Sequence, residues 1–334
     1  MQKITIIGAG LSGLYTALLL QDTYDITILE ARERIGGRIY TIDGFDMGPS
    51  WIWSHQKEIL DLISTMGLTL FSQYTKGEAL YHTTQGVQRF APPPSAPSAR
   101  VEGGLIKLIN AIATQLKPDT LYLNQTVTAI QEEDNILHIT TQETRFQSDY
   151  VLVTLPPRLA AKNISYTPKL APSALQKLQQ TQTWMGHTAK CVIVFEDAFW
   201  REEGLSGFVF SHSGPLSEIH DACTSTQSAL FGFTSTTLPK EQLIEKVREQ
   251  MQTLFGSKGK AIKAIHFIDW REEVFSAVSE DARAMGSHPN YGFNISHFNN
   301  RLHFMGTESA NNEGGYLEGA VISAKKIAKL LSSK

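Results

Sequence analysis

The 334-residue chain has little cysteine, no metal-binding spacing of histidines and no long basic run. Its two cysteines, Cys191 and Cys223, are too few for a disulfide framework, so we expect both to be reduced core residues. The ten histidines form no H-x-x-x-H pair and the cysteines no C-x-x-C pair, which argues against a metal site. A formal net charge of −3 argues against nucleic-acid binding.

Long hydrophobic runs are also missing. Residues 4–20 are nearly free of charge, but they contain three spaced glycines and fall short of the ~18–20 apolar residues that a membrane span needs. A second apolar segment follows without a small-residue cleavage site, so we expect neither a signal peptide nor a membrane anchor. The cytoplasm is the expected location, and the length predicts two domains.

The start of the chain carries the pattern of a dinucleotide-binding unit. The sequence K-I-T-I-I at 3–7 predicts a short buried strand, and the sequence G-A-G-L-S-G at 8–13 follows directly. Leucines at helical spacing then predict a helix, and a second predicted strand at 25–29 ends on Glu30. This order, with an acid about 20 residues beyond the glycines, predicts a bound dinucleotide.

Each part of this pattern has a physical role. Gly8 permits a tight turn, Gly10 lets the backbone approach a pyrophosphate, and Gly13 lets the helix pack closely on the sheet. The helix N-terminus offers free N–H groups and a partial positive charge to the phosphates. Glu30 is placed to accept hydrogen bonds from ribose hydroxyls.

Periodicity beyond residue 30 predicts further helices and strands. The predicted elements are helices at 59–66, 105–116, 239–255 and from Gly315 onward, a hairpin at 79–90, and strands within 121–141 and at 150–154, 190–195, 207–210, 230–234, 262–270 and 302–305. The proline-rich segment 91–97 reads as a stiff connection between domains. Because a late helix in such chains commonly returns to the first domain, we expect a discontinuous cofactor domain with an inserted substrate domain.

Further motifs follow the first in a fixed order. They are Arg34-Ile35-Gly36-Gly37-Arg38, Gly48-Pro49-Ser50-Trp51, Glu102-Gly103-Gly104, Val151-x-Val153-x-Leu155-Pro156-Pro157, Gly186-x-x-x-Lys190, Phe199-Trp200, Gly306-Thr307-Glu308 and Gly315-Tyr316-Leu317-Glu318-Gly319-Ala320. Nearly end to end, their order and spacing resemble the flavin-containing amine oxidase family, which includes the monoamine and polyamine oxidases. The chain is much shorter than typical members of this family, mainly in the substrate half.

The resemblance implies an α/β fold: a Rossmann-like FAD-binding domain of the glutathione-reductase type with an inserted α+β substrate domain. The expected boundaries are 1–75, 100–155 and 298–334 for the FAD domain, and 76–99 and 156–297 for the substrate domain. No cysteine lies in the family's flavin-attachment regions, so we expect FAD to be bound noncovalently.

By the same resemblance, nineteen positions contact FAD. They are Gly8, Gly10, Ser12, Gly13, Glu30, Ala31, Arg32, Gly37, Arg38, Gly48, Pro49, Ser50, Trp51, Val127, Gly306, Glu308, Gly315, Tyr316 and Leu317. Arg38, and with it Arg34, would neutralise the pyrophosphate, and Val127 matches a position whose backbone meets the adenine. The helix that begins near Gly315 would stabilise negative charge at flavin N1.

Three positions match the catalytic residues of the family. Lys190 corresponds to a lysine that holds a water against flavin N5 and assists the reaction with oxygen. Tyr316 corresponds to an aromatic over the reactive face of the flavin, and Trp270 to a tryptophan close to it. A second aromatic usually faces the first one, but residues 275–280 provide none at the expected place. The candidates to replace it are Phe275, Tyr291 and Phe293.

Three functions remain open on the sequence. The first is oxidation of a small amine, with hydride transfer to flavin N5, imine hydrolysis and release of hydrogen peroxide; its partners would be an amine and molecular oxygen. The second is dehydrogenation of a nonamine substrate, or oxidation of a reduced nicotinamide, on the same fold. The third is a noncatalytic flavin-binding protein, against which the presence of both Lys190 and Tyr316 argues. The oligomeric state is left open.

Overall fold

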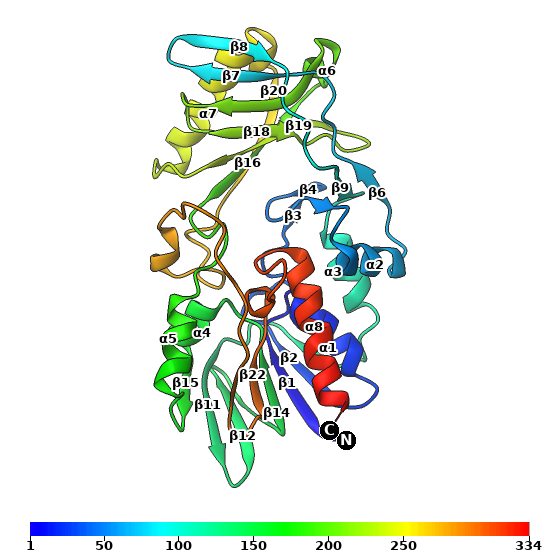
Figure 1. Ribbon diagram of the computed structural model, residues 1–334, viewed down its shortest axis with the longest axis vertical. Coiled ribbons are helices and arrows are strands. Elements are labelled where there is room, and N and C mark those ends of the chain that lie inside the picture. Colours follow the sequence, from blue (N-terminus) through cyan, green and yellow to red (C-terminus); the bar gives the residue numbers. More distant parts are fainter. Residues whose placement is uncertain (334) are drawn as a thin grey trace.

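The structure is a computed structural model that describes residues 1–333. Figure 1 shows an elongated molecule with one large sheet at each end and a smaller group of strands and helices between them. The two chain ends lie together at the lower end, beside the first strand and the last helix. The lower sheet therefore combines the beginning, the middle and the end of the chain.

The lower sheet has six strands in the order β10-β2-β1-β14-β22-β21. Its central strand β1 (Lys3–Ile7) pairs in parallel with β2 (Asp25–Leu29) and β14 (Tyr150–Val153). The outer strands are β10 (Leu121–Tyr122), β22 (Leu302–Phe304) and β21 (Ile295–His297). The central strands are buried along most of their length because both of their faces are covered.

Two helices from opposite ends of the chain cover one face of this sheet. Helix α1 (Leu11–Leu20) packs against α8 (Leu317–Ser332), and the Tyr24 hydroxyl donates a hydrogen bond to the Leu331 carbonyl at 2.9 Å. The other face packs on a four-stranded sheet in the order β13-β12-β11-β15. Its strands are β11 (Val127–Glu133), β12 (Ile136–Thr141), β13 (Arg145–Ser148) and β15 (Ser165–Thr167).

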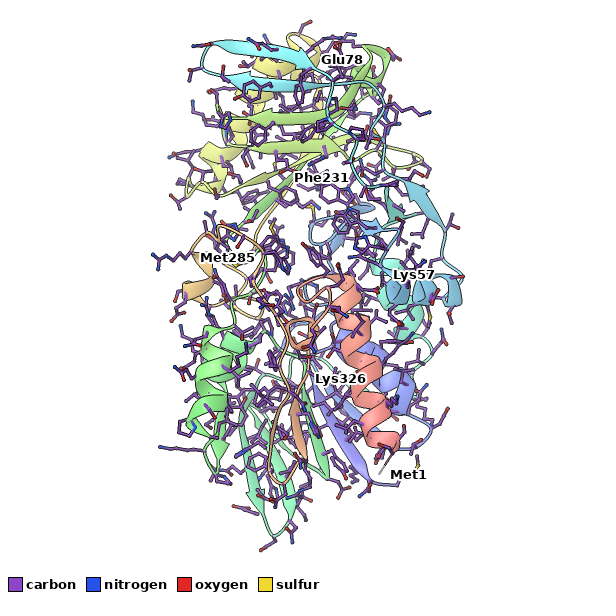
Figure 2. All side chains as sticks on the ribbon, viewed as in Figure 1. Met1, Lys57, Glu78, Phe231, Met285 and Lys326 are labelled. Carbon is purple, nitrogen blue, oxygen red and sulfur yellow. The ribbon has the colours of Figure 1, made fainter. Side chains whose placement is uncertain are left out.

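The upper sheet has seven strands in the order β20-β16-β19-β18-β17-β7-β8. These are β7 (Glu78–Thr83), β8 (Gly86–Phe90), β16 (Ala189–Phe195), β17 (Leu205–Ser211), β18 (Glu218–Asp221), β19 (Ser228–Thr234) and β20 (Ile262–Asp269). Helix α7 (Lys240–Phe255) buries Leu243, Val247 and Met251 against one face. The opposite face turns toward the rest of the molecule, as the position of Phe231 in Figure 2 shows.

Short elements join the two large sheets. They are β3 (Thr41–Ile42), β4 (Phe45–Asp46), β5 (Ile52–Trp53), α2 (Lys57–Thr65), β6 (Leu70–Ser72), β9 (Ser98–Val101) and α3 (Ile106–Ala113). The proline-rich segment 91–97 runs from β8 of the upper sheet to β9 of this middle group, as a connection between separate sheets should.

Helices and strands form at the predicted places, and the structure adds others. Helices α4 (Pro157–Asn163), α5 (Pro172–Gln180) and α6 (Phe199–Glu202) were not predicted. Neither were the short strands β3, β4, β5, β6, β9, β13, β15, β18 and β21. Pro157 does more than stop the preceding strand, because proline suits the first position of a helix and here begins α4. Within residues 1–333, no helix is both long and apolar enough to cross a membrane. The same residues contain no cluster of three potential metal ligands.

Candidate active site

A cavity of about 580 Å³ lies between the lower and the upper sheet. Its wall includes most of the predicted cofactor residues, namely Gly8, Gly10, Ser12, Glu30, Ala31, Arg32, Gly37, Arg38, Gly48, Pro49, Ser50, Trp51, Val127, Gly315, Tyr316 and Leu317. All three predicted catalytic residues, Lys190, Trp270 and Tyr316, line it as well. Gly13, Gly306 and Glu308 are not among the residues of this wall. The fold thus gathers around one cavity residues that are more than three hundred positions apart.

The glycine loop between β1 and α1 forms one end of the cavity. Gly8 has a φ of +106°, a conformation that favours glycine, and any Cβ on Gly13 would lie 2.0 Å from the Gly8 carbonyl oxygen. Gly13 therefore allows the helix to start directly against the strand, although it does not touch the cavity. Gly10 and Ser12 are on the wall, where the first turn of α1 presents its unpaired N–H groups.

Glu30 is buried at the end of β2. Its Oε2 accepts a hydrogen bond from the Ala9 N–H at 2.8 Å, and its Oε1 accepts one from the Arg32 N–H at 2.9 Å. A carboxylate has about four lone-pair sites, so these two bonds leave acceptors for hydroxyl groups in the cavity. Glu30 thus also holds the glycine loop, a role that the sequence did not suggest.

Three arginines follow, and they are held in different ways. Arg38 Nη1 donates to Glu308 Oε1 at 2.6 Å, and Arg32 Nη2 donates to Glu273 Oε2 at 3.0 Å and to Ser276 Oγ at 2.7 Å. Both line the cavity. Arg34 instead donates to the Gly37 carbonyl and stacks on Tyr40. Of the two predicted pyrophosphate partners, the structure places Arg38 on the wall and Arg34 behind it.

The cavity presents polar groups that are ready for a ligand. Among the described residues, the Thr183 hydroxyl and His187 Nδ1 are buried without a hydrogen-bond partner, and both residues line the wall. The cavity also presents glycine-loop N–H groups, two arginines and a buried carboxylate, which are groups that bind phosphates and ribose. Glycines that leave no room for a Cβ shape its end. A dinucleotide fits this donor set.

Lys190 is buried at the start of β16, with only 2 % of its surface exposed. Its Nζ donates to Ser50 Oγ at 2.6 Å and to the Gly48 carbonyl at 3.0 Å, and it lies 4.3 Å from the ring centroid of Phe231. Burial lowers its pKa to about 7, against a partial opposing effect of Asp46. A lysine with this pKa exchanges protons near neutral pH.

The turn that receives Lys190 is itself fixed in place. Asp46 accepts hydrogen bonds from the Thr41 hydroxyl at 2.7 Å and the Leu105 N–H at 2.8 Å, and burial raises its pKa. Trp270 Nε1 donates to the Met47 carbonyl at 3.0 Å, which ties the turn to the end of β20. A Cβ on Gly48 would lie 2.0 Å from the Arg38 carbonyl oxygen. Lys190 thus reaches a turn that is packed from both sides.

An aromatic group surrounds Tyr316 at the start of α8. His288 stacks on the Tyr316 ring with centroids 4.9 Å apart and an interplanar angle of 4°, while Trp53 and Trp184 contact it edge-on at 5.9 and 6.4 Å. None of the three predicted substitutes for the second aromatic forms a ring contact with Tyr316 among the described residues. Phe275 lies under Arg32, the Tyr291 hydroxyl bonds the Gln182 carbonyl, and Phe293 joins the lower core.

The upper sheet contributes a carboxylate to the wall. Glu218 on β18 lines the cavity with a half-exposed side chain, and its Oε1 accepts a hydrogen bond from His220 Nε2 at 2.5 Å. That hydrogen bond lowers the pKa of Glu218. Between Glu218 and Lys190 lies Phe233, which pairs with both of them across the sheet.

A family model described as flavin containing amine oxidoreductase matches residues 11–99 and 86–332 of the chain. The chain belongs to this family. It is therefore a flavin-dependent oxidoreductase of the amine oxidase type, as the sequence motifs predicted.

Curated amine oxidases align with nearly the whole chain. Amine oxidase [flavin-containing] A of Canis lupus familiaris is 25 % identical over 450 aligned positions, which cover 98 % of this chain and 84 % of the dog protein. Amine oxidase [flavin-containing] B of Homo sapiens is 23 % identical over 448 positions, covering 98 % and 85 %. These alignments are longer than the chain itself, so the relatives carry insertions that this chain does not have.

Solved structures of flavin amine oxidases share the mixed α/β fold. Wild-type putrescine oxidase bound to putrescine superposes with a TM-score of 0.84 at 19 % identity, covering 100 % of this chain and 99 % of that one. Cyclohexylamine oxidase from Brevibacterium oxydans IH-35A gives a TM-score of 0.84 at 17 % identity, with 99 % of both chains covered. At these identities the likeness establishes the fold.

Sequence reasoning missed His288, Trp53 and Glu218 as wall or near-wall residues. His288 and Tyr316 are 28 positions apart with no periodic relation, so their stacking follows only from the tertiary fold. For Glu218, the signal was the sequence E-I-H-D at 218–221, whose polar side chains alternate with buried Ile219 in the manner of a strand with one polar face.

Proposed function

We propose that the chain binds FAD noncovalently and oxidises a small amine. The observation that carries the proposal is the single cavity that runs from the glycine loop at Gly8 and Gly10 to the buried Lys190 and to Tyr316. Membership of the family implies a flavin cofactor and, in general terms, an amine substrate. The geometry supports the assignment of residues that we propose below.

The dinucleotide would lie along the first part of the cavity. The N-terminus of α1 and Arg38 would hold the pyrophosphate, Glu30 would bind the ribose of the adenosine, and the backbone at Val127 would contact the adenine. The flavin ring would then lie near Lys190, Trp270 and the start of α8. Cys191 on β16 and Cys223 just after β18 are buried and are absent from the described wall, in line with a noncovalent cofactor.

The reaction removes two electrons and two protons from the C–N unit of an amine, and water then hydrolyses the imine to a carbonyl compound. FAD, when bound, supplies the hydride acceptor at N5 and returns the electrons to oxygen as hydrogen peroxide. Tyr316 and Trp184 would direct an uncharged amine toward the flavin. Unpaired N–H groups at the start of α8 would stabilise negative charge near N1, since Tyr316 as N-cap provides no side-chain cap.

Lys190 would hold a water and move a proton during the oxygen reaction. Its pKa of about 7 suits this role, because a proton donor works best when its pKa is close to the working pH. The carbonyl of Gly48 and the hydroxyl of Ser50 fix the position of the ammonium or amine group.

We further propose the domain division that the sequence predicted: an FAD domain of the glutathione-reductase type made of 1–75, 100–155 and 298–334, and a substrate domain made of 76–99 and 156–297. Its support is that the seven-stranded sheet is built wholly from 78–90 and 189–269. Residues 157–180 and strand β21 pack with the lower sheets, where Ile164, Leu178 and Ile295 share one core, so in space they lie on the FAD side of this division.

An anaerobic spectrum of the purified protein tests the proposal. The oxidised flavin band should bleach on titration with a primary amine, a polyamine or an amino acid, and air should restore it with release of one peroxide per turnover. Bleaching only by reduced nicotinamide would replace amine oxidation by a reductase activity. A protein that no reductant of either class bleaches would be a noncatalytic flavin carrier, and one that cannot be loaded with FAD would contradict the whole proposal.

A further inference from the structure

The wall of the cavity contains two carboxylates among the described residues, Glu30 and Glu218. Glu30 lies at the glycine-loop end, where both of its oxygens accept backbone N–H groups. Glu218 lies at the opposite end, on the upper sheet, and accepts one hydrogen bond from a neighbouring side chain, that of His220. The two carboxylates therefore serve different parts of the cavity, and Glu218 needs an explanation of its own.

Strand register fixes the place of Glu218 relative to Lys190. Phe233 of β19 pairs with Lys190 of β16 on one side and with Glu218 of β18 on the other. Directly paired residues point to the same face of a sheet, so the three side chains form one row. Two strand spacings separate the Cα atoms of Lys190 and Glu218 by about 10 Å. A cationic group, an apolar ring and a carboxylate thus follow one another along the wall.

Exposure increases along this row. Lys190 is 2 % exposed, Phe233 is half-buried, and the Glu218 side chain is 44 % exposed. The deep end carries a lysine and suits an uncharged amine, since a second cation there would be repelled. The outer end carries the carboxylate of Glu218. The row therefore suits a molecule with an uncharged amine at one end, an apolar chain, and a cation at the other end.

His220 holds the Glu218 carboxylate in its position. Its ring is stacked between Phe208 at 5.0 Å and Phe231 at 5.5 Å, and Trp51 meets it edge-on at 4.8 Å. A histidine fixed on three sides gives the hydrogen bond to Glu218 a defined direction.

From this row we infer that the substrate is a diamine, or a longer polyamine, whose distal ammonium group pairs with Glu218 while the other amine is oxidised at the deep end. The inference rests on the proposed amine oxidation and adds a substrate class and a specificity residue to it. Phe233 would contact the methylene chain between the two nitrogens.

The test compares diamines with monoamines of matched length, such as 1,4-diaminobutane with n-pentylamine, on the FAD-loaded protein. The parent should show a lower KM for the diamine. In Glu218→Gln the KM for the diamine should rise about tenfold, the effect of one partly exposed charge-assisted hydrogen bond, while that for the monoamine stays unchanged. Glu218→Asp should keep part of the preference and shift it toward longer diamines.

Glu249→Gln is the matched control, because Glu249 lies on α7 in an exposed ion pair with Lys246 and is not on the cavity wall. Glu249→Gln should leave the KM for the diamine and the KM for the monoamine unchanged. An equal loss for diamine and monoamine in Glu218→Gln, or a parent without diamine preference, would overturn the inference and leave amine oxidation standing.

Calorimetry separates this inference from the proposed function. Protein reduced with dithionite cannot oxidise an amine, so the heat of titration reports binding alone. If no amine is oxidised, tighter binding of the diamine that is lost in Glu218→Gln would still support the cation site. Equal binding of diamine and monoamine by the parent would refute it.

Discussion

The sequence around Lys190 indicates that this residue is buried but not which groups it contacts. The apolar neighbours in 191–195 indicated a buried strand, and the lysine is indeed enclosed, with Phe231 beneath its Nζ. The sequence could not indicate that Ser50 and Gly48 would accept its hydrogen bonds, because the two segments are 140 positions apart. The lowered pKa of Lys190 follows from this enclosure and supports the proposed role in the oxygen reaction.

Replacing Lys190 by methionine should slow flavin reoxidation by about 10², the size of a lost general acid or base. Flavin reduction by the amine should change far less, because the lysine is proposed to act after that step. Stopped-flow absorbance measures the two half-reactions separately. Equal reoxidation rates in variant and parent would remove the assigned role.

The same substitution should alter how stability depends on pH. Burial lowers the pKa of Lys190 from 10.5 to about 7, so between these values the unfolded chain binds a proton that the folded chain does not. The stability of the parent should therefore rise relative to Lys190→Met as the pH increases from 7 to 10.5. Urea unfolding of both proteins across this range measures the difference. A constant difference would mean that the lysine titrates normally.

Glu30→Ala should weaken FAD retention and also destabilise the protein. The substitution removes the proposed ribose acceptor and leaves the N–H groups of Ala9 and Arg32 without their acceptor, at about 1–3 kcal/mol each. Equilibrium dialysis of FAD and chemical unfolding measure the two effects. Glu33→Ala, at an exposed neighbouring position, is the control. Full FAD affinity in Glu30→Ala would count against the ribose contact.

At the scale of elements, the close approach of α1 to β1 depends on one glycine. A Cβ on Gly13 would lie 2.0 Å from the Gly8 carbonyl oxygen, so Gly13→Ala should push the helix away and cost about 2–3 kcal/mol of stability. FAD affinity should fall as well, because the helix N-terminus moves. Thermal denaturation and FAD titration measure both.

Gly286→Ala provides the contrast, because a Cβ there meets no atom within 4 Å and φ is not positive. It should leave stability unchanged or raise it by about 0.4–1 kcal/mol. Similar losses of stability in Gly13→Ala and Gly286→Ala would show that the tight contact at Gly13 does not cause the destabilisation.

The elements that the sequence predicted are those with a strong hydrophobic pattern. Strands β1, β2, β14 and β16 are short segments buried along nearly their whole length, and helix α8 is amphipathic with a repeat near 3.6 residues. Strand β18 has four residues, and helix α5 buries only Leu178 fully, so their patterns are weak. Such elements form because neighbouring strands and sheets support them, which is information the local sequence does not contain.

The residues of the candidate site likewise fall into those that the sequence predicted and those that it did not. Residues in glycine motifs and their flanks could be predicted, because their role depends on local backbone geometry that the motif itself fixes. The positions of His288, Trp53 and Glu218 depend on strand register and on loops that meet from distant segments. The replacement for the second aromatic was sought at Phe275, Tyr291 and Phe293, yet the ring stacked on Tyr316 is that of His288.

At the scale of the whole molecule, the cavity is closed by contacts between the two ends of the chain. Arg38 pairs with Glu308 across 270 positions, and Glu318 of α8 accepts hydrogen bonds from the N–H groups of Glu58 and Ile59. The wall takes residues from the lower sheet, the middle group and the upper sheet. A ligand that fills the cavity would therefore link all three parts.

Removal of FAD should accordingly lower the melting temperature of the protein as a whole. A ligand at 100 times its Kd stabilises by about 2.7 kcal/mol, which is about 5 °C for a chain of this size. Because the wall spans all three parts, the shift should appear in a single transition recorded by calorimetry. FMN lacks the adenosine half that the glycine loop and Glu30 are proposed to hold, so its shift should be much smaller. An equal shift with FMN, or two transitions of which FAD moves only one, would mean that the cofactor occupies one part of the cavity and does not join the sheets.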